Sequence, residues 1–374
     1  MKTAAAATTA LALALTAATS LAAATANAES YGGEPGRDHG RPGVHHGHPA
    51  AHHPRIPFTE ATVTAGADGS YTLKWAAEGV RRVEVRAGGR VVARGTERGE
   101  AVVTGLPAAD RQWFDFRADH GQPLRLADRL VRLDGTVNLR DAGGYRTSDG
   151  RWVRMGEVYR SDALNRLTAD DQATLRRLGI RTVFDLRTQG ERDKDPDRVP
   201  AGTAYTVADV FADSGAFSTM PRTPDEAVRA MIDAEKAMVS SPAGRKAYAQ
   251  VAEGLAAADA RGEAVLFHCT AGKDRTGWAA AALLTGLGVP RATVEADYLA
   301  SNDYRKAAND ALLGHLPPAQ AAVYKPLLDV RPEYLNAGYE EVAARYGGFD
   351  AYLHDGLGLN DHTQHRLQKS LLTD

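Results

Sequence analysis

The 374-residue chain contains a single cysteine, Cys269. No intramolecular disulfide can form, so Cys269 is not half of a structural cross-link. A buried free cysteine commonly serves as a small hydrophobic residue, and this is the alternative to a chemical role. The residues around Cys269 decide between the two.

The sequence also lacks an excess of charge of either sign. It has 45 lysine and arginine residues against 47 aspartate and glutamate residues, for a net charge of −2. A chain with this balance has no overall field that would draw it onto nucleic acid or an anionic membrane. We expect no nucleic-acid partner, and recognition of an anion must be local.

Long apolar runs are absent after the N-terminal segment. Residues 1–28 have the pattern of a Sec signal peptide, with Lys2, an Ala/Leu-rich stretch and the small-x-small cleavage site Ala26-Asn27-Ala28. A transmembrane anchor is the alternative, but the apolar stretch is short and no charges follow it. No twin-arginine pair precedes the apolar stretch, and no cysteine for lipid attachment follows it. We expect a secreted, extracellular protein with no stable membrane anchor.

Residues 29–57 are rich in Gly, Pro and His and cannot build a hydrophobic core. The segment contains six histidines, at positions 39, 45, 46, 48, 52 and 53. Their imidazoles could bind Zn, Cu or Ni weakly, but no cysteine or carboxylate cluster completes a defined site. The composition predicts a flexible linker, and we assign no metal site to it.

Residues 58–133 show the period-2 alternation of β-strands, as in Tyr71, Leu73 and Trp75. The turn signals Asp68-Gly69 and Gly88-Gly89 separate successive strands. Six or seven short strands with this spacing predict a small antiparallel sandwich of the fibronectin type III or immunoglobulin-like kind. The segment has no chemical constellation, and its binding partner is unknown.

Residues 134–374 alternate helix and strand signals, which predicts an α/β domain with a central, mostly parallel sheet flanked by helices. Residues 168–171 resemble a capping box and open a helix that Gly179 ends. Residues 181–186 and 264–267 are apolar and read as buried strands. The second of these runs directly precedes Cys269, and an Ala/Leu-rich helix follows it.

The segment from His268 to Thr276 is a strand–loop–helix connection that can bind an anion. Backbone N–H groups at a helix N-terminus point towards an anion, and Arg275 can contact two oxygens of a phosphate. Such a setting lowers the pKa of a cysteine thiol from about 8.5, so Cys269 could attack phosphorus as a thiolate. The spacing is not that of a nucleotide-binding P-loop, because Asp274 follows Gly272-Lys273.

The sequence His268-Cys269-Thr270-Ala271-Gly272-Lys273-Asp274-Arg275-Thr276 resembles the signature of the protein tyrosine phosphatase superfamily, in its bacterial tyrosine and lipid phosphatase branch. Four further motifs resemble that branch in the same order, at residues 138–145, 158–162, 185–187 and 297–302, and a fifth does so at 346–349. The resemblance covers about residues 134 to 360. It implies a phosphatase without a cofactor, acting on phosphorylated proteins or phosphoinositides.

The resemblance assigns Cys269 as the nucleophile, Arg275 as the phosphate-binding arginine and Thr276 as the residue that assists the leaving thiolate. Thr270, Ala271, Gly272 and Lys273 are the expected phosphate-binding loop residues, together with Asp185 and Arg187 from the middle-strand motif. An extra cation at the rim of the loop, Lys273, suits a second phosphate or acidic group.

The general acid is open between two carboxylates, because no Trp-Pro-Asp sequence occurs in the chain. The related branch suggests Asp274, within the loop itself. Asp185 is the second candidate, and otherwise it would orient Arg275. Asp193, Asp195 and Asp197 lie in a charged segment that we expect to be a solvated turn.

Residues 205–245 occupy the interval in which the related branch carries a helical lid. Thr223-Pro224 is a helix start, and an apolar stripe that includes Met231 and Met238 follows it. Methionine side chains suit an adaptable cover. Ordinary core packing is an equal alternative for this segment.

Two classes of function are compatible with these observations. The first is a hydrolase that cleaves phosphate monoesters through a cysteinyl-phosphate. The second is a binding protein that keeps anion affinity without turnover and uses the β domain as its partner site. Because Cys269, Arg275 and Thr276 are all present, the sequence favours the hydrolase.

Overall fold

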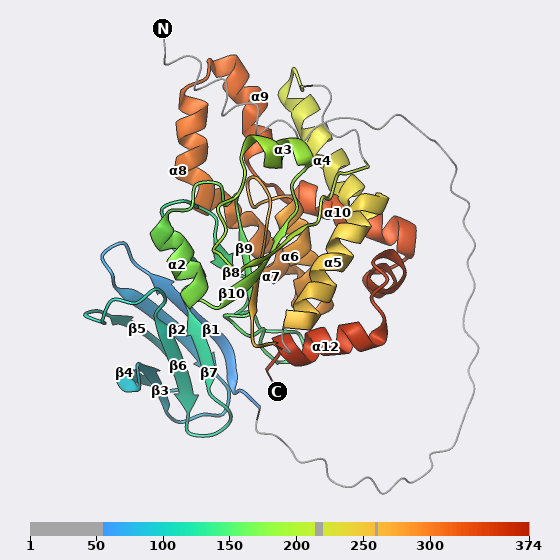
Figure 1. Cartoon of the computed structure of the whole chain (residues 1–374). Coiled ribbons are helices and arrows are strands. Elements are labelled where there is room, and N and C mark those ends of the chain that lie inside the picture. Colours follow the sequence, from blue (N-terminus) through green and yellow to red (C-terminus); the bar gives the residue numbers. More distant parts are fainter. Residues whose placement is uncertain (1–54, 214–219, 259–260, 374) are drawn as a thin grey trace, which may run out of the picture.

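A computed structural model describes residues 55–213, 220–258 and 261–373 (Figure 1). The expected signal peptide and almost all of the expected linker lie outside the described residues. None of the described helices combines the length and apolar character needed to cross a membrane.

Two antiparallel sheets form the N-terminal sandwich (Figure 1). The three-stranded sheet has the order β1 (Phe58–Ala65), β2 (Tyr71–Ala77) and β5 (Arg98–Val103). The four-stranded sheet has the order β4 (Arg90–Gly95), β3 (Val83–Ala87), β6 (Trp113–Ala118) and β7 (Leu124–Ala127).

The alternating residues of these strands make one hydrophobic core between the two sheets, with Leu73, Trp75 and Phe116 among its buried members. Both predicted glycine turns have the backbone that requires glycine. Gly69 and the pair Gly88-Gly89 have φ values of 80°, 53° and 79°, so left-handed turns connect β1 to β2 and β3 to β4.

A five-stranded mixed sheet lies at the centre of the second part of the chain, and it confirms the expected mixed α/β fold. Its order is β11 (Ala204–Val207), β10 (Ile180–Asp185), β12 (Ala264–His268), β9 (Val158–Ser161) and β8 (Arg140–Asp141). The first four strands run parallel, and β8 is antiparallel to β9.

Helices cover both faces of this sheet, and local signals fix where several of them begin. Thr168 and Thr223 each accept a hydrogen bond from the N–H three residues later, which opens α2 and α4. The helices are α2 (Ala169–Arg177), α3 (Gln189–Lys194), α4 (Pro224–Ser240), α5 (Pro242–Ala258), α6 (Arg275–Gly286), α7 (Arg291–Leu299), α8 (Ser301–Gly314), α9 (Pro318–Leu328), α10 (Pro332–Tyr346), α11 (Phe349–Ala351), the π-helical turn η2 (Tyr352–Gly356) and α12 (Asp361–Leu371).

The buried central strand β12 separates two cores. Val265 and Phe267 pack with helices α4 to α7, α10 and α12 on one face, and Ala264 and Leu266 pack with α2 on the other. This alternation keeps β12 fully buried and fixes the position of its last residue, His268. Helices α8 and α9 project from the end of the domain remote from the sandwich (Figure 1).

Side chains from both parts tie the sandwich to the α/β domain. The Arg111 guanidinium lies 2.6 Å from the Asp141 carboxylate and donates to the Tyr159 hydroxyl, with both charged side chains almost fully buried. Trp152 enters the sandwich core and donates to the carbonyl of Phe58. The junction is therefore a packed interface.

Candidate active site

The cysteine loop connects β12 to α6 at the carboxyl edge of the sheet, where Asp185 lies opposite His268 in the parallel register. Gly272 has φ +69°, and a Cβ there would lie 2.6 Å from backbone atoms of Ser161 and Asp162. Only glycine therefore lets the loop lie directly against the end of β9. The loop then enters α6 at Arg275, so Cys269 faces a helix N-terminus.

Cys269 is buried at the base of this loop, with 2% of its surface exposed. Burial alone would raise the pKa of its thiol, but the Arg275 guanidinium and contacts with Thr276 hold that pKa below its ordinary value. This is the direction that favours a reactive thiolate. Thr276 is fully buried at the second position of α6.

A glutamate that the sequence analysis missed holds the side chain of Arg275. The Glu191 carboxylate accepts from Nη1 and Nη2 of Arg275 at 2.7 and 2.8 Å, and it also accepts from the Thr270 hydroxyl. Burial alone would raise its pKa, but Arg275 lowers the pKa of Glu191 to about 2. The sequence carried a local signal, since Thr188 and Glu191 form the capping box of α3.

The structure corrects the expected places of Asp185 and Arg187. Neither side chain lines the active-site cavity. Both are buried beneath the loop, where Arg187 Nη2 lies 2.7 Å from Asp185 and 2.6 Å from Asp197. Asp185 therefore does not orient Arg275, a role that Glu191 fills.

Asp197 was expected in a solvated turn, and this expectation is wrong. Its side chain is 2% exposed and lies 3.0 Å from Nε2 of His268. Asp185, Asp197 and His268 are close enough together to hold a metal ion. Arg187 already supplies positive charge to both carboxylates, so we read the group as an ion-pair cluster.

Lys273 does not stand at the rim as expected. It is 3% exposed, and its Nζ donates to Asp274 Oδ1 at 2.8 Å and to the carbonyl of Asp329 at 3.3 Å. Because the Lys273 ammonium group already donates to two oxygens, it is better placed to orient the Asp274 side chain than to bind a second phosphate group. Asp274 itself lines the cavity.

Helix α4 contributes a buried carboxyl group beside the loop. Glu235 is fully buried; its Oε1 accepts from the Tyr298 hydroxyl at 3.0 Å, and Oε2 has no hydrogen-bond partner among the described residues. Burial raises the pKa of Glu235 well above its usual value, and the charges of Asp274 and Cys269 add to the effect. This environment therefore favours the neutral, protonated form of Glu235 over the carboxylate.

The active-site cavity has a volume of about 510 Å³, far more than one phosphate occupies. One wall carries Cys269, Thr270, Asp274 and Arg275, and apolar side chains of α8 and α9 form another. Met231 reaches the cavity from α4, whereas Met238 is buried in the core. The remaining acidic and basic lining residues are Asp162, Arg166, Lys194, Asp195, Lys273, Arg305 and His315.

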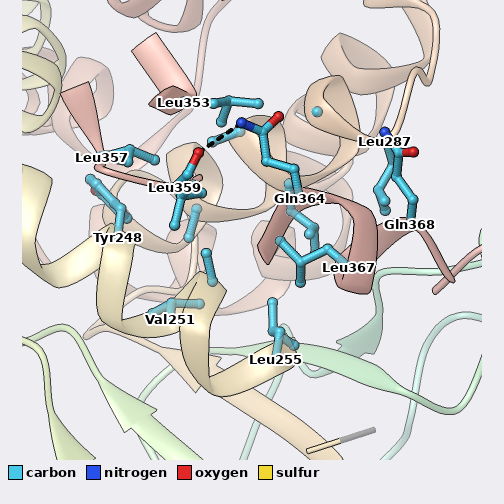
Figure 2. A pocket seen from close by; sticks show the side chains of 15 residues that line it. Tyr248, Val251, Leu255, Leu287, Leu353, Leu357, Leu359, Gln364, Leu367 and Gln368 are labelled. Atoms are coloured by element: carbon cyan, nitrogen blue, oxygen red, sulfur yellow. Dashed lines mark hydrogen bonds between the residues drawn. The ribbon is translucent and has the colours of Figure 1, made fainter. Parts of the chain in front are cut away.

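A separate apolar pocket lies between α5, α6, η2 and α12 (Figure 2). Leucine side chains dominate it, and Gln364 turns its amide to the Leu359 carbonyl at 2.8 Å. Tyr248 is the one titratable residue among those that line it.

Comparison with known proteins agrees with the geometry. Residues 131–373 match the sequence model of the tyrosine phosphatase family. The chain therefore belongs to that family.

Two curated relatives match the same part of the chain. A protein of Cupriavidus necator named among the tyrosine-protein phosphatases is 36% identical over 231 residues, covering 61% of this chain and 84% of the relative. The triple specificity protein phosphatase PtpB of Mycobacterium tuberculosis is 32% identical over 279 residues, covering 64% and 98% respectively. The crystal structure of P. aeruginosa TpbA covers 46% of this chain and 88% of that one at 17% identity, and its TM-score of 0.23 is too low to support an argument.

Proposed function

We propose that the protein is a secreted phosphatase that hydrolyses phosphotyrosine and related phosphate monoesters through a cysteinyl-phosphate. The observation that carries the proposal is the position of Cys269, buried at the N-terminus of α6 with its thiol pKa lowered beside Arg275. Membership of the tyrosine phosphatase family supports the same chemistry.

In the first step the Cys269 thiolate attacks phosphorus, and an S–P bond forms as the ester P–O bond breaks. Arg275 stabilises the phosphoryl oxygens together with the loop amides. The Asp274 carboxylic acid gives its proton to the leaving oxygen, because it lines the cavity whereas Asp185 does not.

In the second step water attacks the phosphocysteine, and Asp274 takes the proton from that water. The S–P bond breaks, releasing phosphate and the thiolate. Thr276 is placed to stabilise that thiolate, because its proximity helps to lower the pKa of the Cys269 thiol. The Nζ of Lys273 keeps the Asp274 side chain in position through its 2.8 Å contact with Oδ1.

The substrate range extends in our proposal to phosphoserine, phosphothreonine and phosphoinositides. The large, partly apolar cavity supports it, as does the printed name of the mycobacterial relative. With Lys273 engaged internally and Arg305 donating to the Ala271 carbonyl at 3.2 Å, Arg166 on the cavity wall is the better partner for a second anionic group.

The test is release of phosphate from p-nitrophenyl phosphate and from a phosphotyrosine peptide, under reducing conditions, with Cys269→Ser as control. We expect turnover in the wild type only. Tight phosphate binding without turnover would instead indicate the binding protein. A panel that adds phosphoserine peptides and phosphoinositides, reported as kcat/KM, defines the range. Export is tested by fractionating cultures that express the chain with and without residues 1–28.

A further inference from the structure

Three segments far apart in the sequence meet behind the cysteine loop. Asn138 and Arg140 come from the first, Arg160 from β9 and Asp297 from α7, and each residue is at most 3% exposed. None of them lines the active-site cavity. They therefore lie on the side of the loop away from the substrate, and we call these four residues the rear clamp.

The rear clamp binds two carbonyl groups of the loop. Asn138 Nδ2 donates to the carbonyl oxygens of Ala271 and Gly272, both at 3.0 Å. Arg160 Nη2 donates to the Gly272 carbonyl at 2.9 Å. A buried carbonyl group needs a hydrogen-bond partner. Because Asn138 and Arg160 belong to other segments of the fold, rotation of a loop peptide would break these hydrogen bonds.

Fixing these carbonyls also fixes two N–H groups. In a trans peptide the C=O and N–H point in opposite directions across one plane. Because Asn138 and Arg160 hold the Gly272 carbonyl at the rear, the N–H group of Lys273 is turned to the opposite side, where the cavity lies. The Ala271 carbonyl also accepts from Arg305, which lines the cavity, at 3.2 Å, so Asn138 and Arg305 together fix the peptide that carries the Gly272 N–H. These are the amides that a loop of this kind offers to an oxyanion.

The other two members hold the donors in place. Arg140 Nη1 donates to Asn138 Oδ1 at 2.5 Å, which leaves the Asn138 amide nitrogen directed at the loop. Asp297 lies 3.3 Å from Arg140 and 2.6 Å from Arg160. Three of the segments that resemble the phosphatase branch, at residues 138–145, 158–162 and 297–302, thus supply polar residues that hold another of them, the cysteine loop.

The rear clamp also carries charge. It contains two guanidinium groups and one carboxylate, so one positive charge is left over within the cluster. Burial and the neighbouring Arg140 lower the pKa of Arg160 to about 10, which still leaves Arg160 charged at neutral pH. A buried positive charge directly behind the loop favours an anion in front of it, since low dielectric weakens screening.

We propose that Asn138 and Arg160 are positioning residues that set the loop amides for oxyanion binding, with Arg140 and Asp297 as their supports. The proposal rests on the function proposed above, but acts through the loop and not on the substrate. It predicts that losing Asn138 weakens oxyanion binding and raises the pKa of Cys269, beyond any loss of stability.

The test compares Asn138→Ala with Asn302→Ala in the full chain. Asn302 makes a matched pair of bonds, with its amide on the Val330 backbone and not on the loop. Three quantities are measured: kcat and KM with p-nitrophenyl phosphate, the inhibition constant of inorganic phosphate, and the pH dependence of Cys269 alkylation by iodoacetamide. The thermal midpoint of each variant reports its stability.

For Asn138→Ala we expect kcat/KM to fall on the order of 10²-fold, as for loss of an oxyanion donor. Phosphate inhibition should weaken at least about tenfold, and the alkylation profile should move to higher pH. Asn302→Ala should keep the wild-type phosphate inhibition and alkylation profile, whatever its thermal midpoint. Unchanged phosphate inhibition and alkylation in folded Asn138→Ala would overturn the proposal.

If Asn138→Ala does not fold, Arg160→Lys gives the same comparison, because it keeps the charge and loses the planar donor to Gly272. Wild-type phosphate inhibition in that variant would also overturn the proposal. A wild type that binds phosphate without turnover would contradict the proposed function alone. The rear clamp would still be tested, because phosphate binding and Cys269 alkylation can be measured without turnover.

Discussion

Replacing Glu191 by glutamine removes the charge that pairs with Arg275 and leaves the side-chain shape almost unchanged. In the folded protein Arg275 lowers the pKa of Glu191 from 4.5 to about 2, despite burial, which acts in the opposite direction. That difference corresponds to about 3 kcal/mol of folding free energy. We therefore expect Glu191→Gln to lower the free energy of unfolding by about 3 kcal/mol at pH 7.

The sign of the pH dependence follows from the same pKa values. Because the folded-state pKa of Glu191 is depressed, its contribution is complete above pH 4.5 and is lost as the pH falls from 4.5 towards 2. The difference in stability between wild type and variant should therefore be constant from pH 7 to about 5.5 and shrink in more acidic solution.

The assay is denaturant unfolding of both proteins at several pH values between 7 and 4. The control is Glu253→Gln, which changes an exposed glutamate on α5. That variant should match the wild type throughout. Equal stability of wild type and Glu191→Gln at pH 7, or a difference that grows in acid, would refute the reasoning.

Three further predictions concern other titratable side chains. Asp274→Asn should lower kcat on the order of 10²–10⁴-fold and flatten the pH dependence that reports the general acid, whereas Asp185→Asn should retain that dependence. Burial raises the pKa of Glu235, so above pH 4.5 this side chain ionises in the unfolded chain and must take up a proton on folding. The free energy of unfolding of Glu235→Gln should therefore rise relative to that of the wild type by up to about 1.4 kcal/mol for each pH unit above 4.5. Arg111→Met should cost about 3–5 kcal/mol, because it leaves the Asp141 carboxylate buried without its partner.

These predictions are checked by pH–rate profiles for the two aspartates and by denaturant unfolding for the other two residues. Asparagine variants with the same pH dependence would contradict the assignment of Asp274. A Glu235→Gln variant whose stability follows the wild type at every pH would contradict a neutral buried acid. Unchanged stability of Arg111→Met would show that the domain junction is not held by the ion pair.

Much of the fold could be predicted because its signals are local. The capping threonines Thr168 and Thr223 stand directly before the helices they open. Asp68-Gly69 and Gly88-Gly89 stand at the hairpin turns, and the apolar run 264–267 becomes the buried strand β12. Each of these signals acts within a few residues, so the sequence alone contains the information needed to place it.

The site was less predictable because its contacts join distant residues. Arg275 and Glu191 are 84 positions apart, and the capping box marks only where α3 begins. From the sequence alone Lys273 looks like an exposed cation, but in the fold its Nζ donates to the distant carbonyl of Asp329. Asp197 belongs to a charged run whose burial is decided by Arg187 and His268. Interactions between charged residues that are distant in the sequence, and not local secondary-structure propensity, determine where these side chains lie.

The central claim is that the phosphoryl group is transferred to the sulfur of Cys269 before water releases it as phosphate. It is tested most directly by mixing enzyme with p-nitrophenyl phosphate, quenching in acid within milliseconds and mapping the modified peptide by mass spectrometry. We predict one phosphoryl group on the peptide that contains Cys269, formed with the first release of nitrophenol, and none in Cys269→Ser. Turnover without phosphorylation of Cys269, or undiminished turnover in Cys269→Ser, would contradict the account.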